Sequence, residues 1–240
     1  MRSGDTAGRS RADPCGVAPE RSLGRRLSAC GGTGGLARRV GYRRSYPLQR
    51  WLGERRRDLD TVEAAHRYVG NISAAGRPRE AGRRLGHTFA LLLVADFQGF
   101  ARDLHDVAAE ALVRLSGAQM PRQPELVAAA TLGRFLDRGN ADLTSIERDF
   151  RRLGIGALYA KIEAKDSSWQ QDRLDFQNLI ALRNALAHGN ERQLIILRRK
   201  GILDTRTWAS GRRPGLNRFA RALDKVVWEH LRNTYNRDPW

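Results

Sequence analysis

Apolar residues recur at helical spacing through most of the chain from Leu59 onward, and this pattern limits the fold to a bundle of helices. The strongest case is the segment 80–115, where Leu91 to Val94 make the helix apolar nearly all round. Its main stripe consists of Leu93, Phe97, Phe100, Leu104, Val107, Ala111 and Leu115. A helix that is apolar on every side belongs in the centre of a core. We therefore predict an all-α bundle built around this segment.

Proline, glycine and capping residues divide the rest of the sequence into further helices. We expect them over about 59–72, through Leu126, Leu132 and Phe135, from Asp142 or Thr144 to Leu153, over 155–164, from Ser167 or Ser168 to His188, and from Pro214 through Leu231. The β-branched segment 194–203 is ambiguous, because it fits either a short strand pair or an irregular crossover.

Residues 1–57 differ in composition from the rest of the chain. They hold 14 arginines and 4 acidic residues, with many glycines and serines and no sustained apolar period. Such a segment buries too little apolar surface to offset the entropy of ordering. We predict a disordered basic tail over 1–57 and one helical domain over 58–240. The tail either binds nucleic acid through its charge or is an incidental extension.

Composition excludes several classes of protein. The only cysteines are Cys15 and Cys30, without metal-ligand spacing, which favours a reducing cytoplasm. No stretch approaches the roughly 20 apolar residues of a membrane span, and no signal peptide is evident. Neither a glycine-rich phosphate loop nor a metal-ligand cluster is present, so we expect no cofactor and no metal. The basic excess of the whole chain, +17, is compatible with a polyanionic partner, but its many arginines also fit a GC-rich genome, where arginine codons are abundant.

The candidate functional residues are Arg183, Asn184 and His188, near the end of one predicted helix. An arginine can grip a phosphate with two parallel hydrogen bonds, and a histidine can move a proton near neutral pH. These two roles are sufficient for cleavage of an RNA backbone without a metal. The alternative is structural, since a histidine near a helix C-terminus interacts favourably with the helix dipole.

The position of Arg183 on its helix requires an explanation. At about 100° per residue, Arg183 falls roughly 20° from Phe176, in the middle of the apolar stripe. An arginine there must be paired, or must face a cleft or a partner chain. Asp96 is a possible counter-ion, in an acidic row with Asp103 and Glu110. The row also fits a solvated face or a set of surface pairs.

Arg173, Gln177, Asn184 and His188 form a second, polar stripe. His188 lies about 140° around the axis and ~7.5 Å along it from Arg183. One helix can bring both groups to one phosphate only if Arg183 bends toward Asn184. Two copies in a symmetric dimer would do so more easily, and twofold dimers are the commonest oligomers. We therefore expect a composite site at a dimer interface.

The motif resembles the signature of the HEPN superfamily, an arginine and often a polar residue, followed after four to six residues by a histidine. Arg183, Asn184 and His188 match it with four residues between. The segments 97–105 (FQGFARDLH), 136–140 (LDRGN) and 146–154 (IERDFRRLG) are similar to parts of bacterial proteins of the RiboL-PSP-HEPN type, as is the closing Pro239–Trp240. The resemblance covers about residues 58–240.

This resemblance implies a helical bundle that dimerises and, for many members, a metal-independent endoribonuclease that acts as a toxin or in phage defence. His188 would be the general acid/base that activates the ribose 2′-OH, and Arg183 would bind the scissile phosphate. Asn184 would orient the phosphate or His188. The expected partners are RNA, a second copy, and an antitoxin or a nucleotidyltransferase. Some members only bind RNA or nucleotides, so a non-catalytic binding module or an interaction subunit is the alternative.

Overall fold

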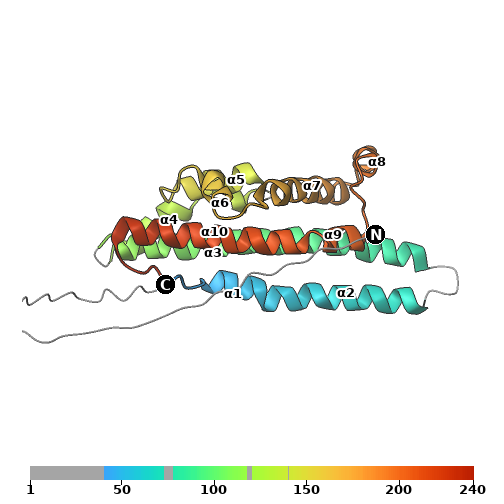
Figure 1. Cartoon of the computed structure of the whole chain (residues 1–240), viewed down its shortest axis with the longest axis horizontal. Helices are drawn as coiled ribbons and strands as arrows, with labels where there is room; N and C mark the ends of the chain where they lie inside the picture. The colour runs from blue at the N-terminus through green and yellow to red at the C-terminus, as the bar shows by residue number, and fades with distance from the viewer. Residues whose placement is uncertain (1–40, 73–77, 118–120, 140) are drawn as a thin grey trace, which may run out of the picture. The chain divides into compact units, whose positions relative to one another are not determined.

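The fold is all-α, as predicted. Figure 1 shows the computed structural model of the chain, which describes residues 41–72, 78–117, 121–139 and 141–240. The helices are α1 (Tyr46–Leu52), α2 (Glu54–Ile72), α3 (Pro78–Leu115), α4 (Gln123–Thr131), the 3-10 turn η2 (Phe135–Asp137), α5 (Leu143–Arg151), α6 (Leu158–Glu163), α7 (Trp169–Ala187), α8 (Glu191–Arg199), α9 (Arg206–Ser210) and α10 (Arg213–Tyr235). These residues form no strand.

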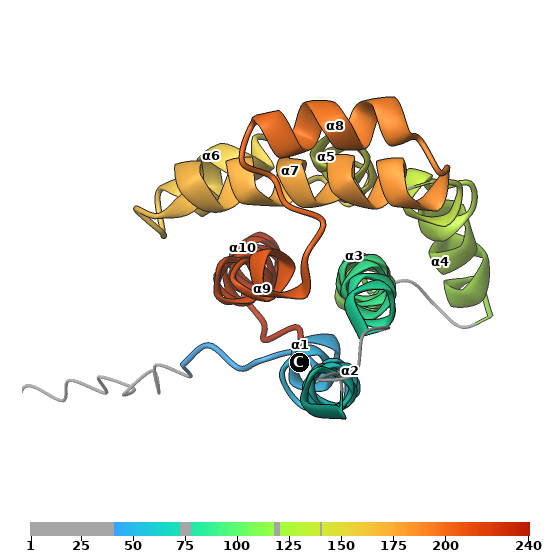
Figure 2. The same ribbon diagram turned by 90° about the vertical axis from the view of Figure 1, so that its right-hand side faces the viewer.

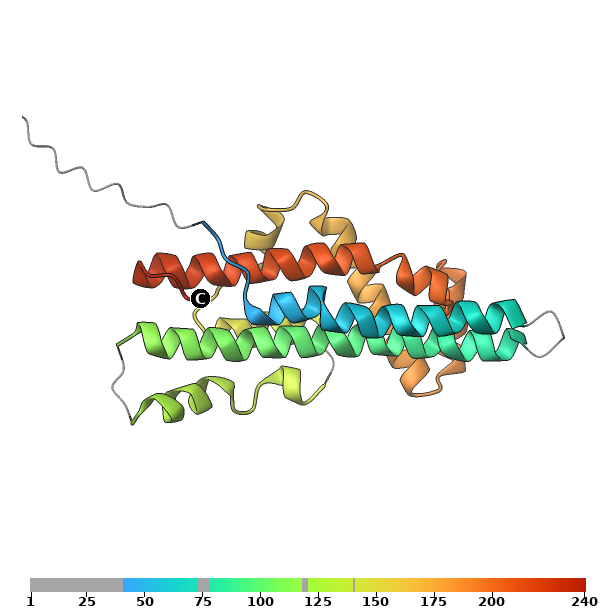
Figure 3. The ribbon, with the colours of Figure 1, turned by 90° about the horizontal axis from the view of Figure 1, so that it is seen from below.

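Helices α3 and α10 form the central pair of the domain, seen end-on in Figure 2. Helices α1 and α2 pack along α3 on one side of the pair, as Figure 3 shows from below. On the opposite side, α7 contacts both α3 and α10, and α8 packs on α7. The long helix predicted over 80–115 is therefore central, which confirms the sequence interpretation. Within the described ranges, no helix combines the length and apolar character needed to cross a membrane.

An aromatic cluster fixes α7 to the central pair. Phe97 of α3, Phe176 of α7 and Phe219 of α10 are buried and in mutual ring contact, with centroids 5.0 to 5.4 Å apart. Trp169 adds a contact to Phe219 at 4.7 Å, at the start of α7. Aromatic pairs at these separations contribute about 0.5–1.5 kcal/mol each beyond the area they bury. The cluster therefore holds α7 in a fixed position along its N-terminal half.

The predicted boundary at residue 57 is wrong. Helix α1 begins after Ser45, whose hydroxyl accepts a hydrogen bond from the Leu48 amide, and α2 begins at Glu54. Leu48 and Trp51 are almost completely buried in the core. A seven-residue helix offers too few apolar positions for a visible period, so the arginine-rich composition around it dominated the prediction. The expected disorder of residues 1–40 lies outside the described residues.

The segment 194–203 is neither a strand pair nor a crossover over most of its length, because it contributes to α8. Asn190 begins this helix by accepting a hydrogen bond from the Gln193 amide at 3.0 Å. Leu194 and Leu197 are buried, whereas the adjacent Ile195 and Ile196 remain almost half exposed. Burial at a spacing of three residues is helical, and the side-chain oxygen of Asn190 supplies the start signal.

The helix expected through Leu126, Leu132 and Phe135 is shorter than predicted. Helix α4 ends at Thr131, and Leu132 has extended backbone angles before η2 begins at Phe135. Leu132 is 79 % exposed, so it is not part of an apolar helical face. Asp142 does cap α5, as one of the two predicted alternatives, by accepting from the Ser145 amide.

Candidate functional site

Helix α7 carries all three candidate residues, and its packing decides which of its faces is free. Leu179 and Ile180 are buried toward the central pair, and Leu182 and Ala185 are buried near its C-terminal end. The remaining face carries the predicted polar stripe of Arg173, Gln177, Asn184 and His188, with Leu174 beside it. Leu174 is 54 % exposed and His188 is exposed, while Asn184 is half-buried. The polar stripe predicted from the sequence therefore faces outward.

The backbone at the end of α7 forms a Schellman motif. Gly189 has φ +59°, and its amide donates to the Leu186 carbonyl at 3.3 Å. The Asn190 amide donates to the Ala185 carbonyl at 2.9 Å. His188 is the C-cap residue, and its own amide donates to the Asn184 carbonyl at 3.1 Å. The imidazole thus extends from a backbone that is fixed by hydrogen bonds, at the junction of α7 and α8.

Arg183 turns toward Asn184. Its Nη1 donates to Asn184 Oδ1 at 3.4 Å, although the two residues leave the helix about 100° apart. The sequence analysis required this bend if a single helix was to present arginine and histidine together. Asn184 is one turn before His188 on the same stripe. Arg183, Asn184 and His188 therefore lie at the C-terminal end of α7, where His188 is exposed and Arg183 and Asn184 are half-buried.

Asp96, a possible counter-ion of Arg183 in the sequence, lies on the side of α3 that faces α2. Arg55 of α2 donates to the backbone carbonyl of Asp96. Arg55 and Arg50 both pair with Asp103, at 2.7 and 3.3 Å. At these two positions α3 therefore contacts arginines of α1 and α2 through the Asp96 carbonyl and the Asp103 carboxylate. Among the described residues Asp96 forms no ion pair with Arg183, whereas Asp103 confirms the alternative expectation of surface pairs. Arg50 and Arg55 could not be foreseen as partners, because they lie in the segment predicted to be disordered.

Asp96 is nevertheless unusual. Its Oδ2 is buried without a hydrogen-bond partner, and burial raises the pKa of the carboxyl. The neighbouring Arg55 opposes this shift by its positive charge. Because Asp96 lies on the α2 side of α3, these properties belong to the packing of α2 and not to the candidate site.

A cluster of Asp204, Arg198 and His87, which no sequence pattern indicated, fixes the segment after α8. Asp204 accepts two hydrogen bonds from Arg198, at 3.0 and 2.6 Å, and its Oδ2 lies 3.0 Å from Nε2 of His87 in α3. The Arg198 guanidinium holds the pKa of Asp204 well below its usual range, with a further contribution from His87. The cluster connects the end of α8 and the segment after it to α3. His87 and Asp204 are 117 residues apart, and no local pattern relates them.

The candidate site lies at a helix end where His188 is exposed. The depressions between α6 and α10, between α3 and α4, and around Arg44 and Lys165 do not include Arg183, Asn184 or His188. No group of three or more acidic, histidine or cysteine side chains suited to a metal is found among the described residues. The chemistry that these three residues offer is phosphate binding by a guanidinium and proton transfer by an imidazole.

Comparison of the chain with models of protein families, with curated proteins and with solved structures finds no match.

Proposed function

We propose that this protein is a metal-independent endoribonuclease of the HEPN type. The observation that carries the proposal is the bend of Arg183 toward Asn184, which brings a guanidinium to the stripe that ends in the exposed His188. The motif resemblance in the sequence supplies the reaction class. Cleavage of RNA by these groups needs an accessible imidazole and an accessible phosphate ligand, and an exposed helix end offers both.

In this reaction His188 accepts the proton of the ribose 2′-OH, and the 2′ oxygen forms a bond to the adjacent phosphorus. The bond from phosphorus to the 5′ oxygen breaks, and that oxygen takes up a proton from water. Arg183 stabilises the charge that develops on the phosphate oxygens. Asn184 holds the guanidinium in its bent position through the contact of 3.4 Å. The products are a 2′,3′-cyclic phosphate and a 5′-OH, and DNA is not cut because it lacks the 2′-OH.

We further propose that two copies pair through the outward stripe of α7. Leu174, which is 54 % exposed, lies beside this stripe, about 40° from His188 around the helix axis. Pairing across a twofold axis would bury this leucine and enclose the exposed helix ends in a shared cleft. The cleft would exclude water and strengthen the electrostatic contacts to the phosphate.

The biological role that fits such an activity is that of a toxin or phage-defence effector, controlled by an antitoxin or by a nucleotidyltransferase. The test is induced expression of the wild type beside His188→Ala and Arg183→Ala, with growth and total RNA followed in each culture. Arg67→Ala serves as control, because Arg67 is an exposed arginine on α2. We expect growth arrest with RNA cleavage in the wild type and the control, and neither in the two site variants.

Toxicity that persists in His188→Ala would contradict the proposal. RNA binding without cleavage under any condition would instead indicate the non-catalytic binding module.

A further inference from the structure

Two neighbouring depressions lie between α10 and the connection from α6 to α7. One, of about 420 Å³, is lined by Lys161, Ala164, Lys165, Val226, Glu229, His230, Asn233 and Thr234. The other, of about 320 Å³, is lined by Tyr42, Arg44, Lys165, Asp166, Arg218, Arg221, Ala222 and Lys225. They share Lys165, and both use α10 as one wall. We treat them together as the α10 groove.

The charges that line the α10 groove are mostly positive. Two of its basic groups have structural partners, since Arg218 pairs with Asp172 at 2.5 Å and Lys165 pairs with Glu229. Four others have no carboxylate within ion-pair distance in the part of the chain that the structure describes: Arg44, Lys161, Arg221 and Lys225. The one remaining acidic group of the lining is Asp166, which accepts a hydrogen bond from Ser168 at 2.6 Å.

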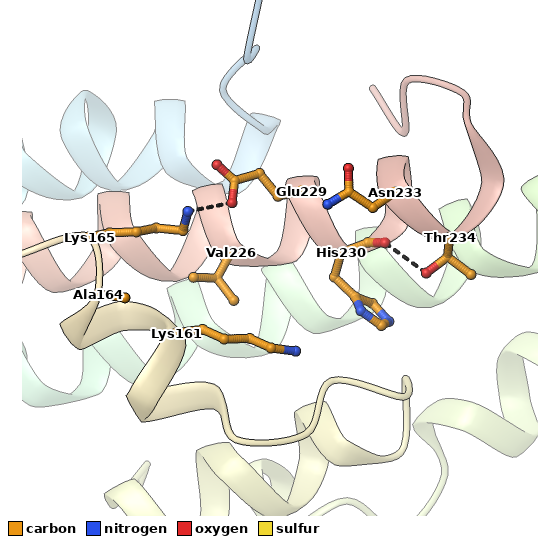
Figure 4. Close-up of a pocket in the computed structure, with 8 residues that line it drawn as sticks. All are labelled: Lys161, Ala164, Lys165, Val226, Glu229, His230, Asn233 and Thr234. Atoms are coloured by element: carbon orange, nitrogen blue, oxygen red, sulfur yellow. Dashed lines mark hydrogen bonds and ion pairs between the residues drawn. The ribbon is translucent and has the colours of Figure 1, made fainter.

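The charges are spread along the groove and not gathered at one point. Arg221 and Lys225 lie one turn apart on α10, and both are exposed. Figure 4 shows Lys161 on α6 opposite His230 of α10, toward the other end of the groove. From Arg218 to Thr234, α10 rises by roughly 24 Å. A stacked nucleic-acid strand carries one phosphate per ~3.4 Å, so this length accommodates about seven phosphates.

The lining contains few groups that would read bases. Its one aromatic residue, Tyr42, donates its hydroxyl to the buried Asp224 and so is already engaged. Contacts from lysine and arginine to phosphates carry no sequence information. A long basic groove is suited to a sugar–phosphate backbone of any sequence, whereas a small phosphate ester would reach only one or two of the four basic groups.

We propose that the α10 groove binds the backbone of single-stranded RNA and holds the substrate away from the cleavage point. The inference rests on the proposed function, because it names a second contact for the same substrate. Asp172, which anchors Arg218 beside the groove, lies 16 residues before His188 on α7, or roughly 24 Å along the helix. A strand in the groove therefore does not occupy the candidate site, and the two contacts can be tested separately.

The test is the affinity of the full chain for a fluorescein-labelled oligo(U) 12-mer with 2′-O-methyl groups, measured by anisotropy from 50 to 200 mM salt. This RNA cannot be cleaved by attack of the 2′ oxygen, so the assay reports binding whether or not the chain is a nuclease. The groove variant is Arg221→Ala with Lys225→Ala. The matched control is Arg57→Ala with Arg67→Ala, which removes the same charge from exposed positions on α2.

We expect the groove variant to lose about tenfold in affinity and about 1.4 in the slope of log K against log salt, from two phosphate contacts at ~0.7 each. The control should stay within about twofold of the wild type, and all three proteins should have the same far-UV circular dichroism. A single-stranded DNA 12-mer should show the same difference between variants.

Equal losses in the groove variant and the control would overturn the inference, since they would reflect net charge alone. No loss in the groove variant, or no binding by the wild type, would also overturn it. Failure of the proposed function has a different signature, namely that His188→Ala leaves RNA cleavage unchanged.

Discussion

The amide of Ser45, the residue before α1, donates to Oδ2 of Asp224 in α10 at 3.3 Å, and the Ser45 hydroxyl donates to the other carboxylate oxygen. Both residues are completely buried. Tyr42 donates its hydroxyl to the same carboxylate, so the segment before α1 is attached to the central helix of the domain. A buried carboxylate without a cationic partner is costly, and this one is sustained by three donors.

The Asp224 carboxyl makes stability depend on pH in a direction that can be tested. Burial raises its pKa, and the hydrogen bonds from Ser45 and Tyr42 only partly offset the shift. The folded state therefore holds the proton more tightly than the unfolded state, whose aspartate has a pKa of about 3.9. The stabilisation from protonated Asp224 is complete below that value and is lost as the pH rises through the folded pKa.

Asp224→Asn should remove this contribution, because the amide keeps the shape but does not titrate. Urea unfolding from pH 4 to pH 8 should show the wild type losing free energy of unfolding relative to the variant as the pH rises. Parallel curves for the two proteins would mean that the carboxyl has the same pKa folded and unfolded.

Trp51 tests whether α1 belongs to the folded domain. Its side chain is 2 % exposed, in ring contact with Phe97 at 5.5 Å, and its Nε1 donates to Asn217 at 2.9 Å. Trp51→Ala should lower the free energy of unfolding by about 3–5 kcal/mol. Tyr68→Ala is the control, because Tyr68 is 69 % exposed, and it should change stability by less than about 0.5 kcal/mol. An equally small change in the free energy of unfolding for both variants would support the original prediction that residues 1–57 are disordered.

Two glycines one turn apart in α3 should respond oppositely to alanine. A Cβ at Gly86 would lie 2.8 Å from the backbone nitrogen of Arg206 in α9, whereas one at Gly82 would only touch a His66 side chain at 3.8 Å. Gly82→Ala should stabilise the protein by about 0.5–1 kcal/mol through helix propensity. Gly86→Ala should destabilise it, since overpacking typically costs about 1–3 kcal/mol. The melting temperatures of both variants should be compared with that of the wild type. An increase for Gly86→Ala as well as for Gly82→Ala would show that α9 does not approach α3 this closely.

Complementation between inactive chains distinguishes a site within one chain from a site shared by two copies. Because Arg183 bends toward Asn184 on the helix that also carries His188, we expect both groups to act from one chain. A mixture of His188→Ala with Arg183→Ala, shown to form mixed dimers after subunit exchange, should then remain inactive in RNA cleavage. Recovery to a sizeable fraction of the wild type would place the two groups on different copies.

The sequence predicted the elements whose apolar period is long. Helix α3 and the helix that carries Arg183 were placed correctly, because many turns repeat the same spacing. Helix α1 was missed because it contributes few residues to the core, although one of them, Trp51, is almost completely buried there. Helix α8 was not predicted because the adjacent β-branched residues Ile195 and Ile196 favour a strand. In the structure these two are exposed, and Leu194 and Leu197 form the buried face of the helix.

The candidate site could be named from the sequence, but its surroundings could not. The residue spacing placed Asn184 and His188 on one stripe of the helix. It also showed that Arg183 must bend toward Asn184 to reach that stripe. The ion pairs of Asp103 with Arg50 and Arg55 join residues far apart in the chain, and so does the lining of the α10 groove. Arg44, Lys161 and Lys225 come together only when α10 packs between the segments that carry them, and no local pattern predicts that arrangement.

The most direct measurement is the cleavage rate of a labelled RNA by the purified protein in EDTA, compared between wild type, His188→Ala and a control, His66→Ala, on α2. We predict that the wild type and the control cleave at equal rates and leave 2′,3′-cyclic phosphate ends. His188→Ala should lose at least about 10²-fold, the usual contribution of a general acid/base. Cleavage by His188→Ala at the wild-type rate would contradict the assignment of His188, and with it the proposed function.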